Sequence, residues 1–309
     1  MRIRATVAAV SGALALSALS ALVAPAALAA DGPKAPAGVA PANKAAHSAS
    51  TGKAAFSSTA DAEGTPYALD ASFSNVKVNK GKNIPVGTTN VVKVPVSFTL
   101  NHGEDVNIHA ADFVAGIELY RGATFEDEIW WFDSNVATCS DSSTTAASCT
   151  ATVEIDPADL LNEDAGAWKA AGFAVAFNGE DQENPNLDNV GVAVTDKVAA
   201  FNLQRYSKLT VNAAPEPVKK GKTVTVTGKL SRANWDDNQY HGYTNQPVKL
   251  QFRKKSSSTY TTLKTIKSNS TGELKTTTPA TVDGYFRYSF AGTTTTPAVS
   301  AAGDFVDVQ

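Results

Sequence analysis

The fold class is decided by residues 92–100, which read VKVPVSFTL. Apolar side chains occupy every second position from Val92 to Leu100, and Lys, Pro, Ser and Thr fill the positions between them. This period of two predicts a β-strand with one face buried. Pro95 lacks a backbone N–H, so we expect the strand to have an edge or a bulge there.

Similar alternation recurs along most of the chain. We expect further strands near residues 113–119, 151–155, 173–177, 190–194, 198–203, 209–211, 224–230, 248–252, 263–266, 286–290 and 306–308. Their number and spacing predict an all-β protein with two consecutive β-sandwich (Ig-like) domains. For the second domain, an orthogonal barrel is the alternative. Residues 156–161, DPADLL, depart from the pattern and predict a short helix that extends toward Lys169.

The N-terminus has the features of a secretory signal peptide. Arg2 and Arg4 precede an apolar stretch, and Ala27-Leu28-Ala29 forms a small-x-small cleavage site. The alternative is a membrane anchor. We expect a signal peptide at 1–29, a disordered Ala/Pro/Ser/Lys-rich spacer at 30–66, and a secreted, extracellular product with no membrane contact after cleavage.

Charge divides the rest of the chain into two parts. Residues 67–204 form the predicted first domain, and residues 64–204 carry 7 basic and 20 acidic side chains. Residues 205–309 form the predicted second domain, with 15 basic and 7 acidic side chains. The first domain is therefore acidic and the second basic. A charged fraction of only 18% argues against a coiled coil or a highly charged disordered protein.

The two cysteines, Cys139 and Cys149, are separated by nine residues. In an exported protein this spacing predicts one disulfide that clips a hairpin. A redox pair or a metal site would require closer spacing or more thiol and imidazole ligands.

The second domain also resembles a known group of proteins. The similarity lies in residues 216–230 (EPVKKGKTVTVTGKL), 248–255 (VKLQFRKK) and 283–288 (DGYFRY), which resemble the Ig-like modules of secreted actinobacterial proteins. That resemblance implies a C-terminal Ig-like sandwich serving as a spacer or an adhesive unit, with no catalytic residues to transfer. Proteins of this layout are largely uncharacterised and are sometimes described as calcium-binding.

Acidic clusters are the candidate metal ligands. Calcium prefers carboxylate, amide and carbonyl oxygens, which dense acidic loops between strands provide. The candidate residues are Glu126, Asp127, Glu128, Glu180, Asp181, Glu183 and Asp188. The alternative is a set of solvated hairpin loops that bind no ion. Calcium is the only cofactor we predict.

Aromatic and basic residues suggest a surface for a partner. Trp235, Tyr240 and Tyr243 lie in one long segment and are the candidate ligand surface; the alternative is a loop folded onto its own domain. Basic residues of the second domain suit an anionic wall polymer, or are ordinary strand-face lysines. They are Lys249, Arg253, Lys254, Lys255, Lys264 and Lys267. The expected partner is an extracellular or cell-wall polymer or protein, and not a nucleic acid.

The sequence gives little indication of an enzyme. It contains no nucleophile elbow, phosphate-binding loop, dinucleotide fingerprint or CxxC pair. We therefore predict a non-enzymatic binding or structural interaction protein without catalytic residues. One alternative is a secreted carbohydrate-active hydrolase, which requires two carboxylates at glycosidase separation in a cleft. The other is a plain structural spacer.

Overall fold

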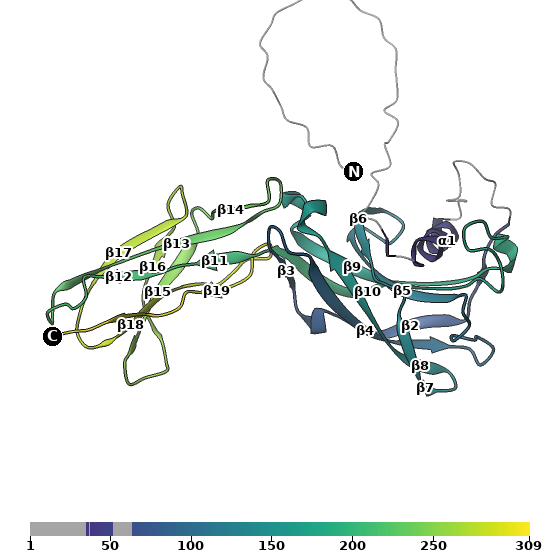
Figure 1. Cartoon of the computed structure of the whole chain (residues 1–309), viewed down its shortest axis with the longest axis horizontal. Coiled ribbons are helices and arrows are strands. Elements are labelled where there is room, and N and C mark those ends of the chain that lie inside the picture. Colours follow the sequence, from purple (N-terminus) through teal and green to yellow (C-terminus); the bar gives the residue numbers. More distant parts are fainter. Residues whose placement is uncertain (1–34, 37, 52–63) are drawn as a thin grey trace, which may run out of the picture.

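The computed structural model describes residues 35–36, 38–51 and 64–309, so the predicted signal peptide lies outside the described residues. Two β-rich lobes lie end to end (Figure 1). We call the lobe with α1 and β1 to β10 the first domain, and the lobe with β11 to β20 the second domain. The predicted all-β sandwich class is confirmed by the sheets of both lobes. No helix among the described residues is long and apolar enough to cross a membrane.

The first domain contains two sheets. Sheet A has the order β1-β10-β9-β5-β6, and β3 also pairs with β10. Sheet B has the order β2-β4-β8-β7. The strands of sheet A are β1 (Tyr67–Ala68), β3 (Ile84–Val86), β5 (Phe113–Gly122), β6 (Glu128–Asp133), β9 (Gly166–Ala176) and β10 (Gly191–Arg205). Those of sheet B are β2 (Ala71–Val78), β4 (Val92–His102), β7 (Thr138–Ser143) and β8 (Ala146–Ile155).

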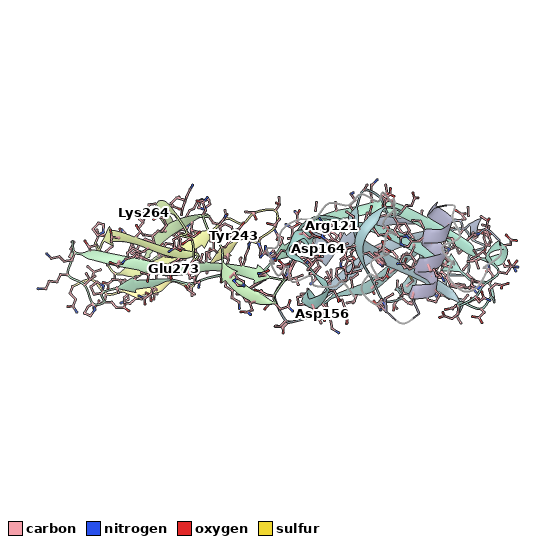
Figure 2. All side chains as sticks on the ribbon, turned by 90° about the horizontal axis from the view of Figure 1, so that it is seen from above. Arg121, Asp156, Asp164, Tyr243, Lys264 and Glu273 are labelled. Atoms are coloured by element: carbon pink, nitrogen blue, oxygen red, sulfur yellow. A yellow bond between two sulfur atoms is a disulfide. The ribbon has the colours of Figure 1, made fainter. Side chains whose placement is uncertain are left out.

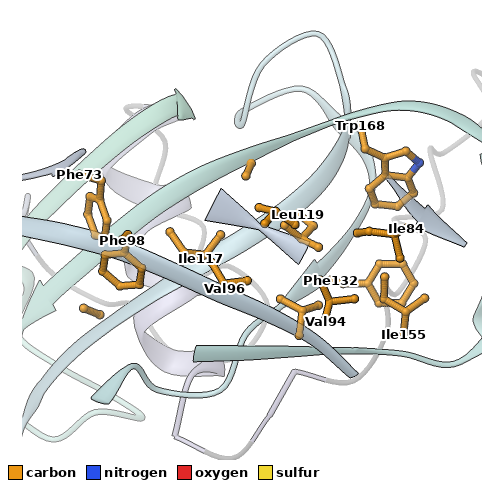
Figure 3. Close-up of a cluster of buried hydrophobic side chains, with 14 of the residues drawn as sticks. Phe73, Ile84, Val94, Val96, Phe98, Ile117, Leu119, Phe132, Ile155 and Trp168 are labelled. Carbon is orange, nitrogen blue, oxygen red and sulfur yellow. The ribbon is translucent and has the colours of Figure 1, made fainter. Parts of the chain in front are cut away.

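The strand expected at residues 92–100 is confirmed as part of β4, and its alternate side chains from Val94 to Leu100 are buried. They meet side chains of sheet A, including Ile117 and Leu119, in the core between the sheets (Figure 3). Pro95 lies one residue beyond the last β2–β4 pair, Val78 with Val96. At Pro95, β4 therefore pairs only with β8. No strand pairs with Pro95 on its other side, so its missing N–H leaves no hydrogen bond unmade there.

Part of the predicted spacer is ordered. Residues Ala40–Thr51 form α1, which lies on the face of sheet A that is turned away from sheet B (Figure 1). The side chains of Val39, Ala42, Ala45 and Ala46 are fully buried there. The expectation of disorder throughout 30–66 is wrong for α1, because contacts with sheet A offset the cost of ordering this short helix.

The prediction of a helix after Asp156 is also wrong. Asp156 does act as an N-cap, and its side chain accepts a hydrogen bond from the Ala158 N–H. Only two short 3₁₀ turns follow, η2 (Pro157–Asp159) and η3 (Asn162–Asp164), before β9 begins. The buried Leu160 has an extended backbone between them, so burial of this side chain interrupts the helix.

Two further 3₁₀ turns, η1 (Asn79–Gly81) and η4 (Leu187–Asn189), lie in loops of the first domain. The disulfide between Cys139 and Cys149 is confirmed. The two residues are direct cross-strand partners on β7 and β8, so the bridge closes this hairpin as predicted.

The second domain is a sandwich of two further sheets around one apolar core. Sheet C contains β11 (Ser207–Leu209), β12 (Asn212–Ala214), β13 (Thr223–Asn234), β14 (Gln239–Gly242) and β17 (Glu273–Pro279). Sheet D contains β15 (Pro247–Lys254), β16 (Thr261–Lys267), β18 (Gly284–Phe290), β19 (Val299–Ser300) and β20 (Asp304–Val306). The sequence pattern does not predict β14 or β17, because neither has a regular apolar alternation.

Candidate functional site

The predicted calcium loop at 180–189 is held together by its own hydrogen bonds. The Glu180 carboxylate accepts from the Asn186 N–H at 3.0 Å and from Asn189 Nδ2 at 2.7 Å, and these bonds lower the Glu180 pKa. Asp181 accepts from the Glu183 N–H at 2.9 Å. Several carboxylates of this loop therefore already have donors, as expected for a capped turn.

Asp188 belongs to the same loop and accepts a hydrogen bond from the Thr65 N–H at 2.8 Å. In the described part of the chain, no three side chains of His, Cys, Asp or Glu are arranged to hold a metal ion. Calcium binding by this loop stays a prediction.

The acidic run 126–128 is divided between two environments. Glu126 and Asp127 are exposed in the turn between β5 and β6, where Asp127 accepts from the Thr124 hydroxyl. The Glu128 side chain, by contrast, is only 14% exposed and faces His47 of α1. The three acids therefore do not converge on one point.

Trp235 is not on an exposed surface, so this part of the predicted partner surface is wrong. Its side chain is fully buried against the first domain, and its indole N–H donates to the Gly87 carbonyl at 2.9 Å. The Trp235 N–H also donates to Asn162 Oδ1 at 3.0 Å, and the Asn162 N–H donates to Asp236 Oδ1 at 2.9 Å. The segment that we expected to bind a partner joins the two domains instead.

Tyr240 and Tyr243 are half-buried near this junction. The Lys208 ammonium lies 3.5 Å from the Tyr240 ring centroid, and the Arg232 guanidinium lies 4.0 Å from that of Tyr243. Both rings therefore already contact cations of their own domain. Figure 2 shows Tyr243 in the second domain, on the side toward the first domain, in which Arg121 and Asp164 are labelled.

A second basic and aromatic surface lies on the outer face of sheet D. We call it the Arg–Tyr face and define it by Arg253 on β15, Tyr260 before β16, Tyr285 and Arg287 on β18, and Phe305 on β20. All five side chains are half-buried, so part of each is accessible to solvent. The period of two directs the neighbouring Phe252, Phe286 and Tyr288 to the core instead.

Cations and rings alternate across the Arg–Tyr face. The Arg253 guanidinium lies 3.8 Å from the Tyr285 ring centroid, and the Arg287 guanidinium lies 3.8 Å from that of Tyr260. The Tyr285 and Phe305 ring centroids are 5.1 Å apart. Arg253 also donates to the Ser257 carbonyl at 2.9 Å, and Arg287 donates to Gln251 Oε1 at 2.8 Å. These contacts hold each guanidinium in place, which lowers the entropy cost of using its remaining donors.

Lysines extend this surface toward the end of the second domain. A shallow depression of about 550 Å³ is lined by Lys220, Lys254 and Lys255, with Asp283 as its acidic residue. The Lys255 ammonium also lies 5.3 Å from the Phe305 ring centroid, so the depression adjoins the Arg–Tyr face. Three of the six basic residues singled out in the sequence, Arg253, Lys254 and Lys255, therefore lie in one region.

The remaining candidate is an acid cluster under α1, which we define as Glu118, Glu128 and Asp133. Glu118 and Asp133 are cross-strand partners on β5 and β6, with side chains that are almost completely buried. Asn43 Nδ2 donates to Glu118 Oε2 at 2.9 Å and also to Asp133 Oδ1. His47 Nε2 lies 3.0 Å from the same Glu118 oxygen.

Burial controls the ionisation of these groups. It raises the Asp133 pKa to about 8, and the nearby Glu118 charge contributes to the increase. Burial raises the Glu118 pKa well above its usual value and lowers the pKa of His47. The low-dielectric environment thus favours protonated carboxyl groups and a neutral imidazole.

Sequence reasoning did not identify Asn43, His47 or Glu118 as functional candidates. Asn43 and His47 are four residues apart, a spacing that places them on one helical face, but their segment has the composition of a spacer. Glu118 falls on the face of β5 that the alternation assigned to solvent. Its burial depends on α1, which is distant in the sequence.

The carboxyl pair does not form an open cleft. Two depressions on the second domain each contain one carboxylate, Asp283 in one and Glu273 in the other. Glu118 and Asp133 are instead capped by Asn43 and His47. The arrangement differs from the open two-carboxylate cleft that the hydrolase alternative requires.

Comparisons with known proteins identify no family. No family model matches the sequence, and no curated protein matches it. Similar solved structures include the Ig1–Ig3 ectodomain of mouse nectin-like molecule 4, with 15% identity and a TM-score of 0.23 over 75% of this chain and 63% of that one. The D0–D1 domain of intimin has 14% identity and a TM-score of 0.24 over 76% and 97%.

The Yersinia pseudotuberculosis adhesin InvE has 11% identity and a TM-score of 0.24 over 75% of this chain and 58% of that one. This chain spans less than two thirds of the nectin-like and InvE structures. Similarity at this level carries no argument about function. The sandwich fold rests on the chain's own sheets, and a relationship to secreted actinobacterial proteins stays a prediction.

Proposed function

We propose that this protein is an exported, non-enzymatic binding protein that attaches to an anionic extracellular polymer through the second domain. The single observation that carries the proposal is the Arg–Tyr face, where the guanidinium groups of Arg253 and Arg287 each lie 3.8 Å from a tyrosine ring centroid. Guanidinium groups match carboxylate and phosphate oxygens, and partly open rings can pack against sugar or polyol carbons.

The surrounding charge supports an anionic partner. Lys220, Lys254 and Lys255 line the adjoining depression, and the second domain has a net charge of +8 in the sequence. Export is supported by the predicted signal peptide and by the disulfide, which is typical of oxidising compartments. A plain spacer would require neither the clustered cations nor the aromatic side chains between them.

The test is binding of the full chain to two soluble polymers, poly(glycerol phosphate) and polygalacturonate, measured by calorimetry at low and high salt. We expect Arg253→Gln with Arg287→Gln to weaken binding by about tenfold or more at low salt, because each exposed ion pair contributes up to about 1 kcal/mol. Comparison of the two polymers separates phosphate from carboxylate recognition.

A matched control uses Lys77→Gln with Lys80→Gln. These residues line a depression on the first domain, so the variant loses the same formal charge at a different place. Equal loss of binding in both variants would reduce the effect to net charge and contradict the proposed site. Absence of binding to both polymers at low salt would also refute the proposal.

A further inference from the structure

We propose that α1 is a detachable strap, and that its docking on sheet A is coupled to the uptake of protons by Glu118 and Asp133. The inference concerns the first domain and is independent of the polymer-binding proposal. It rests on the contacts of the helix, on the burial of the acid cluster and on the small apolar area that α1 contributes.

The apolar contacts of α1 with sheet A contribute little to its stability. Apart from Val39, which precedes the helix, its buried apolar side chains are Ala42, Ala45 and Ala46, each of which buries little area. The opposing face of sheet A supplies large side chains, including Phe125 and Phe173. A 12-residue helix is not stable alone in water, so it forms only while this face holds it.

Polar contacts therefore control the docking. One nitrogen, Asn43 Nδ2, donates to both Glu118 and Asp133, which places two carboxyl oxygens within about 6 Å of each other. Two ionised carboxylates at that separation in a buried site repel each other strongly. A proton on either group removes the repulsion and leaves the hydrogen bonds from Asn43 intact.

Unpaired oxygens in the cluster support the same conclusion. Among the described residues, Glu118 Oε1 and Glu128 Oε2 are buried and have no hydrogen-bond partner. An ionised carboxylate left in this state has a large desolvation cost, whereas a protonated one is neutral. The unpaired Glu118 Oε1 is therefore a suitable position for a proton.

Among the described residues, the groups that face the cluster are mostly further acids or have partners of their own. Asp196 on β10 accepts a hydrogen bond from the Tyr120 hydroxyl of β5, and Lys169 on β9 donates to the Gly122 and Ala123 carbonyls. The remaining facing groups are Glu126 in the turn, Glu128 on β6 and His47 on α1.

The direction of the pH effect follows from the changes on docking. Burial raises the pKa of Asp133 to about 8 and that of Glu118 in the same direction, so both groups gain protons when α1 docks. Docking is therefore favoured at low pH and weakens as the pH rises from about 4 to about 8. His47 opposes this below pH 6.5, because burial lowers its pKa. The steepest change is thus expected between pH 6.5 and 8.

The experiment measures the position of α1 in the full chain by double electron–electron resonance. Ala49→Cys and Ile129→Cys introduce two exposed labelling sites, one on α1 and one on β6, and the native cysteines are already joined. We expect one narrow distance distribution at pH 6. A broad second population should grow by about tenfold or more relative to the first between pH 6.5 and 8.

The matched variant carries Glu118→Gln and Asp133→Asn in addition. Amides keep the shape of protonated carboxyl groups but do not ionise in this range, so the distribution should stay narrow from pH 6 to 9. The proposal is overturned if the parent distribution is constant over that range, or if the amide variant responds as the parent does. Loss of the near-ultraviolet circular dichroism of the parent at pH 9 would also overturn it, because the whole domain would then be unfolding.

Discussion

Replacing Trp235 with alanine should uncouple the two domains. Trp235 is part of the second domain by its position in the sequence, but its side chain is fully buried in the core of the first domain. Removal of a buried Trp side chain costs about 3–5 kcal/mol, which includes the cavity left behind. At about 2–4 °C per kcal/mol for a chain of this size, the first-domain melting temperature should fall by about 6–20 °C.

Differential scanning calorimetry measures this shift, and small-angle scattering should show a larger radius of gyration. Trp235→Phe keeps most of the apolar contact and removes only the donor to Gly87, so it should cost about 1–2 kcal/mol. Leu263→Ala, on an exposed side chain, should change stability by less than about 0.5 kcal/mol. If Trp235→Ala shifts melting no more than Leu263→Ala does, the junction is not held by this contact.

Three further predictions concern the first domain. Replacing Cys139 and Cys149 with serine should destabilise it by about 2.5–3 kcal/mol, because the bridge closes a short loop; unchanged urea unfolding would contradict this. Asp164→Ala should cost about 2–4 kcal/mol in the same assay, because its buried carboxylate pairs with Arg121 at 2.9 Å; a change below 1 kcal/mol would show that the pair is dispensable. Millimolar calcium should raise the melting temperature of the first domain if loop 180–189 binds it, and equal melting with calcium and with chelator would eliminate the calcium prediction.

The sequence was most informative where one face of a strand is buried. The alternation through Val94, Val96 and Phe98 predicted β4, and similar patterns predicted the cores of both sandwiches. It was less informative for β17, where Thr276, Thr277 and Thr278 give no apolar alternation. That strand forms because β13 offers it a long antiparallel ladder, which is a tertiary property.

The acid cluster illustrates why the candidate sites were harder to predict. Every residue of β5 from Phe113 to Tyr120 is buried, so its alternation could not reveal which face α1 covers. Glu118 lies 75 residues from Asn43, and no local pattern links them. The alanines of α1 also give a weak apolar signal, although their spacing fits a helix. The Arg–Tyr face had a readable signal, because Arg287 occupies an outward position of a predicted strand and Arg253 and Tyr285 directly adjoin predicted strands.

The burial of ionisable groups also affects the electrostatic field that the opposite net charges of the two domains produce. The value of −13 for residues 64–204 counts every acid as ionised, but Glu118 and Asp133 have raised pKa values and are held away from water. Arg253 and Arg287, by contrast, reach solvent on the Arg–Tyr face. The field outside the first domain is therefore weaker than its sequence suggests, and that of the second domain is not reduced in this way. If the polymer-binding proposal is correct, the second domain should attract the anionic polymer and the first domain should repel it, which would orient the first domain away from the polymer surface. Because salt screens exposed charges much more than buried ones, this orientation should be lost at high ionic strength while α1 remains docked.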